Sequence, residues 1–371
     1  MNRAPEALPP ARLLALSLSF HAAFLSLALL SARMLGLMST ATAPPMEIEI
    51  TSPAKVDAPP QSNILEKAPE PTKDYARNHA ESASRYRKAA EQGDARAQFS
   101  LGGMYYIGRG VAQDYGKAVS WYRKAAEQGD AQAQSNLGTM YYQGHGVVQN
   151  YGEAASWYRK AAEQGYADAQ YILGAMHYQG HGVAKNYEEA VSWFRKAAKQ
   201  GYADAQYYLG GMCREGYGVA KNYEEAASWY RKAAAQRYAP ASYTLGLMYF
   251  QGHGVAKDYK KAVSWFGKAA EQGDADAQYF LGEMCDLGLG VARNHAEAVF
   301  WYRKAAEQGN AAAQGALREL EEALGNTSGS SSEAQGAQPS LAVPTEVSQE
   351  DIREMIQAAM KDAAGGQLRS P

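Results

Sequence analysis

Residues 129–164 read GDAQAQSNLGTMYYQGHGVVQNYGEAASWYRKAAEQ, and close copies of this stretch recur along the chain. One tryptophan and one helix-interior glycine return every 36 residues, six times each, without an insertion. A strict period of this length indicates an array of stacked structural repeats. The two series are Trp121, Trp157, Trp193, Trp229, Trp265 and Trp301, and Gly102, Gly138, Gly174, Gly210, Gly246 and Gly282.

Each copy contains two helical patterns separated by a glycine turn. In the first, apolar residues fall at i, i+4, i+7 and i+8, which is one face of a helix: Ala133, Leu137, Met140 and Tyr141. Gly144-His145-Gly146 ends this helix, with glycine supplying a left-handed cap. Asn150 and Glu153 form a capping-box pattern that opens the second helix. That helix places four residues on one side: Ala154, Trp157, Tyr158 and Ala161.

Two short helices cannot bury their apolar faces alone, but stacked copies can. The sequence therefore predicts an all-α solenoid at residues 74–325, with six full units from 93 to 308 and a half unit at each end. The C-terminal half unit carries a polar exterior, as the end of a solenoid requires. The fifth unit departs from the pattern at Arg237, Pro240 and Ser242, which predicts a local irregularity.

These residues resemble the Sel1-like repeat family, a relative of the tetratricopeptide repeats. The resemblance lies in AxAQ-x-x-LG-x-MY, then GxGV, then EEA-x-x-WYRKAAEQG, and it covers about 250 of the 371 residues. It implies antiparallel helix pairs in a right-handed superhelix that acts as an adaptor for other proteins. It also implies a bacterial protein of a kind that is often exported.

Partner binding is expected on the inner face, which the first helix of each unit forms. An aromatic stripe beside small residues makes a groove suited to an extended peptide or a helix, and aromatics with arginine are typical of interface hot spots. In a competing interpretation, the aromatic residues of the series that starts at Phe99 pack between repeats and are not free to bind a partner. The predicted binding residues are Phe99, Tyr171, Tyr207, Tyr243 and Tyr279, together with Tyr106, Tyr142, Tyr178, Arg214 and Phe250.

The N-terminus predicts a single membrane anchor. After a short cytoplasmic stretch at 1–12, the segment 13–37 begins with twenty uncharged residues, LLALSLSFHAAFLSLALLSA, about 30 Å of helix. The alternative is a cleaved signal peptide that ends near Ala41-Thr42-Ala43. The anchor interpretation places the protein in the bacterial inner membrane as a single-pass protein, with its repeats in the periplasm. The expected partners are then proteins or peptides of the cell envelope.

The segments that flank the repeats differ from them in composition. Residues 39–73 are proline-rich and predict an extended spacer. Residues 326–346 predict a flexible linker, and 347–363 predict a short amphipathic helix. Three roles are open for this helix: docking in its own groove, binding a partner, or remaining disordered.

The anchor also resembles, more weakly, that of TonB-type energy transducers. Ser17 and His21 read S-x-x-x-H and share one helix face, and an ionisable residue at membrane depth usually marks a function. The resemblance implies contact with a proton-channel motor complex. A tolerated histidine near the end of an anchor is the competing interpretation, and the receptor-binding C-terminal domain of that family is absent.

Other classes of function find little support in the sequence. The 37 Lys and Arg nearly balance the 39 Asp and Glu, so nucleic acid is not an expected ligand. His145, His181 and His253 recur one per repeat, too far apart to share a metal ion. Cys213 and Cys285 lie two repeats apart, which predicts free buried thiols. No catalytic or phosphate-binding motif occurs, so neither an enzyme nor a cofactor is predicted.

Overall fold

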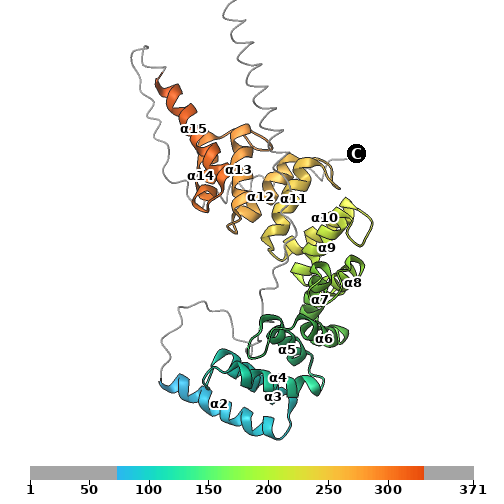
Figure 1. Cartoon of the computed structure of the whole chain (residues 1–371). Helices are drawn as coiled ribbons and strands as arrows, with labels where there is room; N and C mark the ends of the chain where they lie inside the picture. The colour runs from blue at the N-terminus through green and yellow to red at the C-terminus, as the bar shows by residue number, and fades with distance from the viewer. Residues whose placement is uncertain (1–72, 330–371) are drawn as a thin grey trace, which may run out of the picture. The chain divides into compact units, whose positions relative to one another are not determined.

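The computed structural model describes residues 73–329, with side chains from 78 to 324 (Figure 1). This range contains fourteen helices, α2 to α15, and no strand. The expected membrane segment at 13–37, with Ser17 and His21, lies outside the described residues, as do the tail helix at 347–363 and nearly all of the spacer. Among α2 to α15, none has the length and apolar character needed to cross a bilayer.

The helices alternate between two types, here named helix A and helix B. The A helices are α3 (Ala95–Ile107), α5 (Ala131–Gln143), α7 (Ala167–Gln179), α9 (Ala203–Glu215), α11 (Ala239–Gln251) and α13 (Ala275–Leu287). The B helices are α4 (Tyr115–Glu127), α6 (Tyr151–Glu163), α8 (Tyr187–Lys199), α10 (Tyr223–Ala235), α12 (Tyr259–Ala270) and α14 (His295–Glu307). The half units are α2 (Lys73–Glu91), of type B, and α15 (Ala311–Gly329), of type A.

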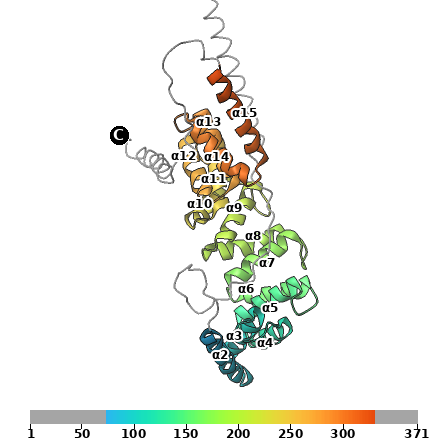
Figure 2. The same cartoon turned by 90° about the vertical axis from the view of Figure 1, so that its left-hand side faces the viewer.

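The described residues fall into two compact units, 73–241 and 242–329. In the N-terminal unit each helix packs against the next along the chain, from α2 to α10. In the C-terminal unit α12 packs against α13, α13 against α14 and α14 against α15, which lies along α14 in both views (Figures 1 and 2). Consecutive helices are therefore neighbours in space, which is the arrangement of a solenoid.

The helix ends follow the predicted signals. The residue before each B helix accepts a hydrogen bond in its side chain from the backbone three residues on, as Asn150 Oδ1 does from Glu153 N at 3.0 Å. Gly144 ends α5 in the left-handed conformation, with φ 76°, and its N–H donates to the Met140 carbonyl. These caps confirm the predicted bounds of both helices, because they satisfy backbone groups that a helix end leaves unpaired.

Glycine inside helix A allows close approach to helix B. A Cβ on Gly246 would lie 2.5 Å from Cδ1 of Phe266, and one on Gly102 would lie 2.7 Å from Cδ1 of Tyr122. Both rings are almost fully buried. The 36-residue glycine spacing therefore results from rings that lie directly on the helix A backbone.

The tryptophans are less buried than the rings beside them. Tyr158 is fully buried, whereas Trp157 on the same predicted side is only half-buried, and Lys160 Nζ lies 3.9 Å from its ring centroid. Lysine covers Trp121, Trp193, Trp229 and Trp265 in the same way, at 3.6–4.2 Å. Trp121, Trp157, Trp229 and Trp265 thus lie at the edge of the core, held by cation–π contacts, whereas Trp193 and Trp301 are buried.

A buried glutamine in helix A ties neighbouring helices together. Gln134 Nε2 donates to the Ala126 carbonyl at 3.0 Å, and its Oε1 accepts from Gln164 Nε2 at 2.8 Å. Gln98, Gln170, Gln206 and Gln278 make the same pair of bonds. We call this series the glutamine ladder.

The fifth repeat interrupts the glutamine ladder, as its sequence predicts an irregularity. Ser242 replaces the glutamine, its buried hydroxyl has no hydrogen-bond partner in the described structure, and Gln272 bonds instead to the Lys268 carbonyl at 2.8 Å. Arg237 is the one non-glycine residue of the described range with positive φ, at 62°.

Candidate functional site

The site predicted from sequence lies on helix A, which is the more buried helix of each repeat. In α5 every residue from Ala133 to Met140 is buried, and α7 is buried from Ala169 to His177. The small residues expected to floor a groove, such as Thr139 and Ala175, are among them. Helix A therefore meets solvent only near its two ends.

The predicted series nearest the start of helix A packs against aromatic rings of helix B and of the next repeat. In the N-terminal unit, Phe99 lies 5.8 Å from the Tyr122 ring, and the Tyr207 ring lies 5.5 Å from Tyr230 and 5.4 Å from Tyr238. Phe99 and Tyr207 remain partly exposed. Tyr171, against Phe194 and Tyr202, is buried.

The same series continues in the C-terminal unit. Tyr243 is buried against Phe266 and Phe280, with ring centroids 5.9 Å apart in each case. Tyr279 lies 5.9 Å from Tyr302 and is partly exposed. Three members of this series, Phe99, Tyr207 and Tyr279, are thus partly exposed, whereas Tyr171 and Tyr243 are buried.

The second predicted series, near the end of helix A, forms three-ring clusters with the following turn. Tyr142 lies 4.9 Å from Tyr151, the first residue of helix B, and 6.4 Å from His181 in the next repeat. His181 Nδ1 lies 3.2 Å from the Tyr142 hydroxyl, and burial together with the charge of Tyr151 raises the pKa of Tyr142. All three rings keep some exposure.

Two further clusters repeat this arrangement. Tyr106 packs at 5.3 Å from Tyr115, on which His145 stacks at 4.8 Å, and Tyr178 packs at 5.3 Å from Tyr187, on which Tyr217 stacks at 4.9 Å. The histidines expected only to occupy turns therefore also pack on the preceding repeat. The 36-residue recurrence of Tyr115, Tyr151 and Tyr187 was the available signal for these clusters.

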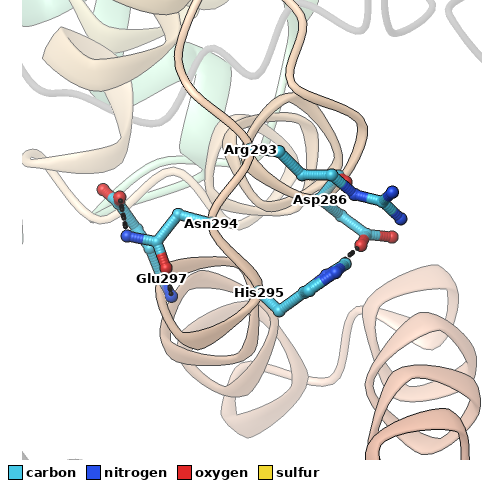
Figure 3. Close-up of polar contacts among 5 residues, drawn as sticks. All are labelled: Asp286, Arg293, Asn294, His295 and Glu297. Carbon is cyan, nitrogen blue, oxygen red and sulfur yellow. Dashed lines mark hydrogen bonds and ion pairs between the residues drawn. The ribbon is translucent and has the colours of Figure 1, made fainter.

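The remaining predicted members of this series differ in chemistry. Arg214, partly exposed, pairs with Glu215 through a 2.6 Å contact from Nε to Oε1. Phe250 is buried 5.4 Å from Tyr259. At the equivalent place in the last full repeat, Asp286 Oδ1 lies 2.8 Å from His295 Nδ1 (Figure 3). An ion pair or hydrogen bond thus replaces the ring pair where the array ends.

Around this last pair, the turn before α14 is held by polar contacts. Arg293 Nε donates to the Asp286 carbonyl at 2.8 Å, and Asn294 Nδ2 donates to Glu297 Oε2 at 3.3 Å (Figure 3). Burial raises the pKa of Glu297. These contacts fix one turn, and no group of His, Cys, Asp or Glu in the described residues is arranged to hold a metal ion.

Sequence reasoning missed a third set of residues, at the start of helix A in the N-terminal unit. The Tyr202 hydroxyl donates to Asp168 Oδ1 at 2.9 Å, and the Tyr238 hydroxyl donates to Asp204 Oδ1 at 3.1 Å. Each bond joins consecutive repeats. The four side chains are partly exposed, beside the predicted residues Tyr171 and Tyr207.

Comparison with known proteins identifies these helix pairs. The family model described as Sel1 repeat matches residues 86–94, 95–130, 131–166, 167–202, 203–238, 239–274 and 275–310, which is more than half of the chain. The chain belongs to the Sel1 repeat family. Each matched segment from 95 onward starts at the first residue of a helix A, so the family unit coincides with the helix A and helix B pair.

Two solved structures are similar to this Sel1 repeat protein. A protective antigen of uropathogenic Escherichia coli with this fold has a TM-score of 0.63 and 35% identity over 80% of this chain and 65% of its own. A Sel1 repeat protein from Oxalobacter formigenes has a TM-score of 0.55 and 35% identity over 62% of this chain and 92% of its own. The chain thus spans 65% of the E. coli protein. No curated protein matches it significantly in sequence.

Proposed function

We propose that this Sel1 repeat protein is a scaffold that binds other proteins through the ends of its A helices. Sel1 repeat solenoids commonly mediate protein–protein interaction. The observation that carries the proposal here is the recurrence of partly exposed aromatic side chains at one place in successive repeats: Tyr106, Tyr142 and Tyr178. Rigid aromatic residues held by neighbouring rings bind partners at low entropic cost.

Photo-crosslinking in cells tests this proposal. A benzophenone amino acid at Tyr106, Tyr142 or Tyr178 should give the same adduct from each position. Matched controls at Ser120, Ser156 and Ser192, which are exposed on the B helices, should not give it. A partner that crosslinks equally from the serine positions, or no common adduct from the tyrosines, would contradict binding at the ends of helix A.

We further propose that the scaffold is anchored in the inner membrane with its repeats in the periplasm. The support is the uncharged run that starts at Leu13, which has the length of a bilayer core. The full chain should stay with the membrane after alkaline extraction, and protease should reach the repeats in spheroplasts but not in intact cells. A mature N-terminus near Pro44 would show cleavage and exclude the anchor.

A second candidate, an energy-coupled transducer, rests on Ser17 and His21 alone. Motor contact through these residues predicts that His21→Ala abolishes function while membrane insertion and partner binding persist. Unchanged function in this variant would eliminate the transducer. We propose no catalytic activity under either candidate, and reproducible turnover of generic hydrolase substrates by the purified chain would overturn that view.

A further inference from the structure

Tyrosines and aspartates recur at the start of helix A in successive repeats of the N-terminal unit. We call this set the tyrosine–aspartate surface, and it consists of Tyr166, Asp168, Tyr202, Asp204, Tyr207 and Tyr238. Hydrogen bonds join Tyr202 to Asp168 and Tyr238 to Asp204, and the Tyr207 ring lies 5.4 Å from that of Tyr238. All six residues are partly exposed.

Tyrosine at these positions costs the repeats a helix cap. Asp94, Asp130 and Asp274 occupy the same position in other repeats and accept hydrogen bonds from the backbone of their helices at 2.6–2.8 Å. Tyr166 and Tyr202 make no side-chain cap bond. Loss of such a cap destabilises a helix, because a backbone N–H at its start is left without a partner. Helices α7 and α9 therefore each lack the N-terminal side-chain cap that other A helices have.

The bond between repeats does not explain that loss. Asn310 Nδ2 donates to Asp276 Oδ1 at 2.8 Å, which is the same connection that Tyr202 makes to Asp168, while Asn310 Oδ1 also accepts from Ala313 N at 2.9 Å. Asparagine thus supplies the connection and the cap together. What tyrosine adds is a partly exposed ring, which packs at 5.2 Å on Tyr171 in the case of Tyr202 and at 5.4 Å on Tyr207 in the case of Tyr238. A local cap is thus given up for an aromatic face that a partner can also reach, and a broken local rule is a sign of function.

The charge of the surface is not neutralised within the described chain. Asp168 accepts hydrogen bonds from the neutral hydroxyls of Tyr202 and Ser135, and neither Asp168 nor Asp204 is in an ion pair with a described residue. Burial raises the pKa of Asp168, and the charge of Asp204 raises it further. A cation brought to this place would be stabilised by both carboxylates.

We propose that the tyrosine–aspartate surface binds lysine or arginine side chains of a basic peptide segment in the partner. Carboxylates form charge-assisted hydrogen bonds with such side chains, and tyrosine faces attract them through cation–π contacts. The chain uses this pairing internally, with Lys185 Nζ 5.0 Å from the Tyr187 ring centroid. The inference rests on the proposed scaffold function and specifies the chemistry of its partner.

Peptide binding to the purified full chain tests the inference. Fluorescence anisotropy would compare a labelled peptide of alternating lysine and alanine with its glutamate and serine counterparts at low salt. We expect the lysine peptide alone to bind, with an affinity that falls as salt rises. Equal binding of the three peptides overturns the inference, and so does binding of none, as would follow if a segment of this chain already covered the surface.

Two pairs of variants locate the binding. Asp168→Asn with Asp204→Asn should weaken binding about tenfold or more, the loss expected when about 1.4 kcal/mol of charged contact is removed. Glu188→Gln with Glu224→Gln removes the same charge from exposed positions of α8 and α10 and should change affinity less than about twofold, because surface charges contribute little. Equal effects of the two pairs overturn the inference.

Tyr166→Ser separates recognition from stability. Serine can cap α7, so the melting temperature should hold or rise, whereas loss of the ring should weaken lysine-peptide binding severalfold. Unchanged binding contradicts the role of the ring. If the crosslinked partner is still captured when the aspartates are replaced, the chemistry proposed here fails and the scaffold function stands. If the chain with both aspartates intact gives no common adduct from Tyr106, Tyr142 and Tyr178, the proposed scaffold function itself fails.

Discussion

At the scale of single residues, His177 couples folding to pH. It lies in α7 where Tyr105 and Tyr141 stand in other repeats, and it is 7% exposed. Burial lowers its pKa from the usual 6.5, Arg159 lowers it further and Glu189 opposes the shift. The folded state thus favours neutral histidine. Its contribution to stability is present above about pH 6.5 and is lost as the pH falls below that value towards the folded pKa.

His177→Tyr should remove this contribution. We expect the melting temperature of the variant to fall less than that of the parent chain between about pH 7 and pH 5, a range that spans the histidine pKa. Thermal unfolding followed by circular dichroism at both pH values measures the difference. Parallel pH profiles for the two proteins would show that His177 is not the titrating group.

Two glycines in the C-terminal unit test how closely helix A and helix B approach. Gly246→Ala places a methyl group against the buried Phe266 ring and should destabilise the chain by about 1–3 kcal/mol. Gly315→Ala, in α15, meets no atom within 4 Å and should stabilise it by about 0.5–1 kcal/mol. Urea unfolding compares the two. Equal stabilities would mean that the rings do not lie on the helix A backbone.

At the scale of helices, the glutamine ladder supplies the polar connection between repeats. Gln134→Ala leaves the buried Ala126 carbonyl without its partner, which costs about 1–3 kcal/mol, whereas the exposed Gln164 amide can bond to water instead. Gln132→Ala, at a partly exposed position of the same helix, serves as the control and should be nearly neutral. Similar urea midpoints for the two variants would deny the ladder a role in stability.

Helix identity and helix ends followed from the sequence because their causes are local. The apolar spacing of Ala133, Leu137 and Met140, the cap at Asn150 and the left-handed Gly144 all act within one repeat. Contacts between repeats did not follow in the same way. The stacking of His145 on Tyr115, and the bond from Tyr202 to Asp168, depend on how far one repeat is rotated against the next. No spacing within a single unit specifies that rotation.

At the scale of the molecule, the repeat array was predictable and the surface it leaves open was only partly so. Strict 36-residue spacing indicated a solenoid, and the family match confirms it over residues 86–310. The predicted binding residues remain a prediction. Among them the structure exposes Tyr106, Tyr142 and Tyr178 in part. It buries Phe250 at the equivalent position, against the rings of Tyr259 and Phe280.

Hydrogen exchange of the full chain, resolved by mass spectrometry, tests most directly whether stacked repeats bury helix A and leave partners only its ends. We predict slow exchange in α5, α7 and α9, faster exchange in the glycine turns, and a profile that repeats every 36 residues. Uniformly fast exchange over residues 95–310, or A helices that exchange faster than the B helices that cover them, would contradict the account.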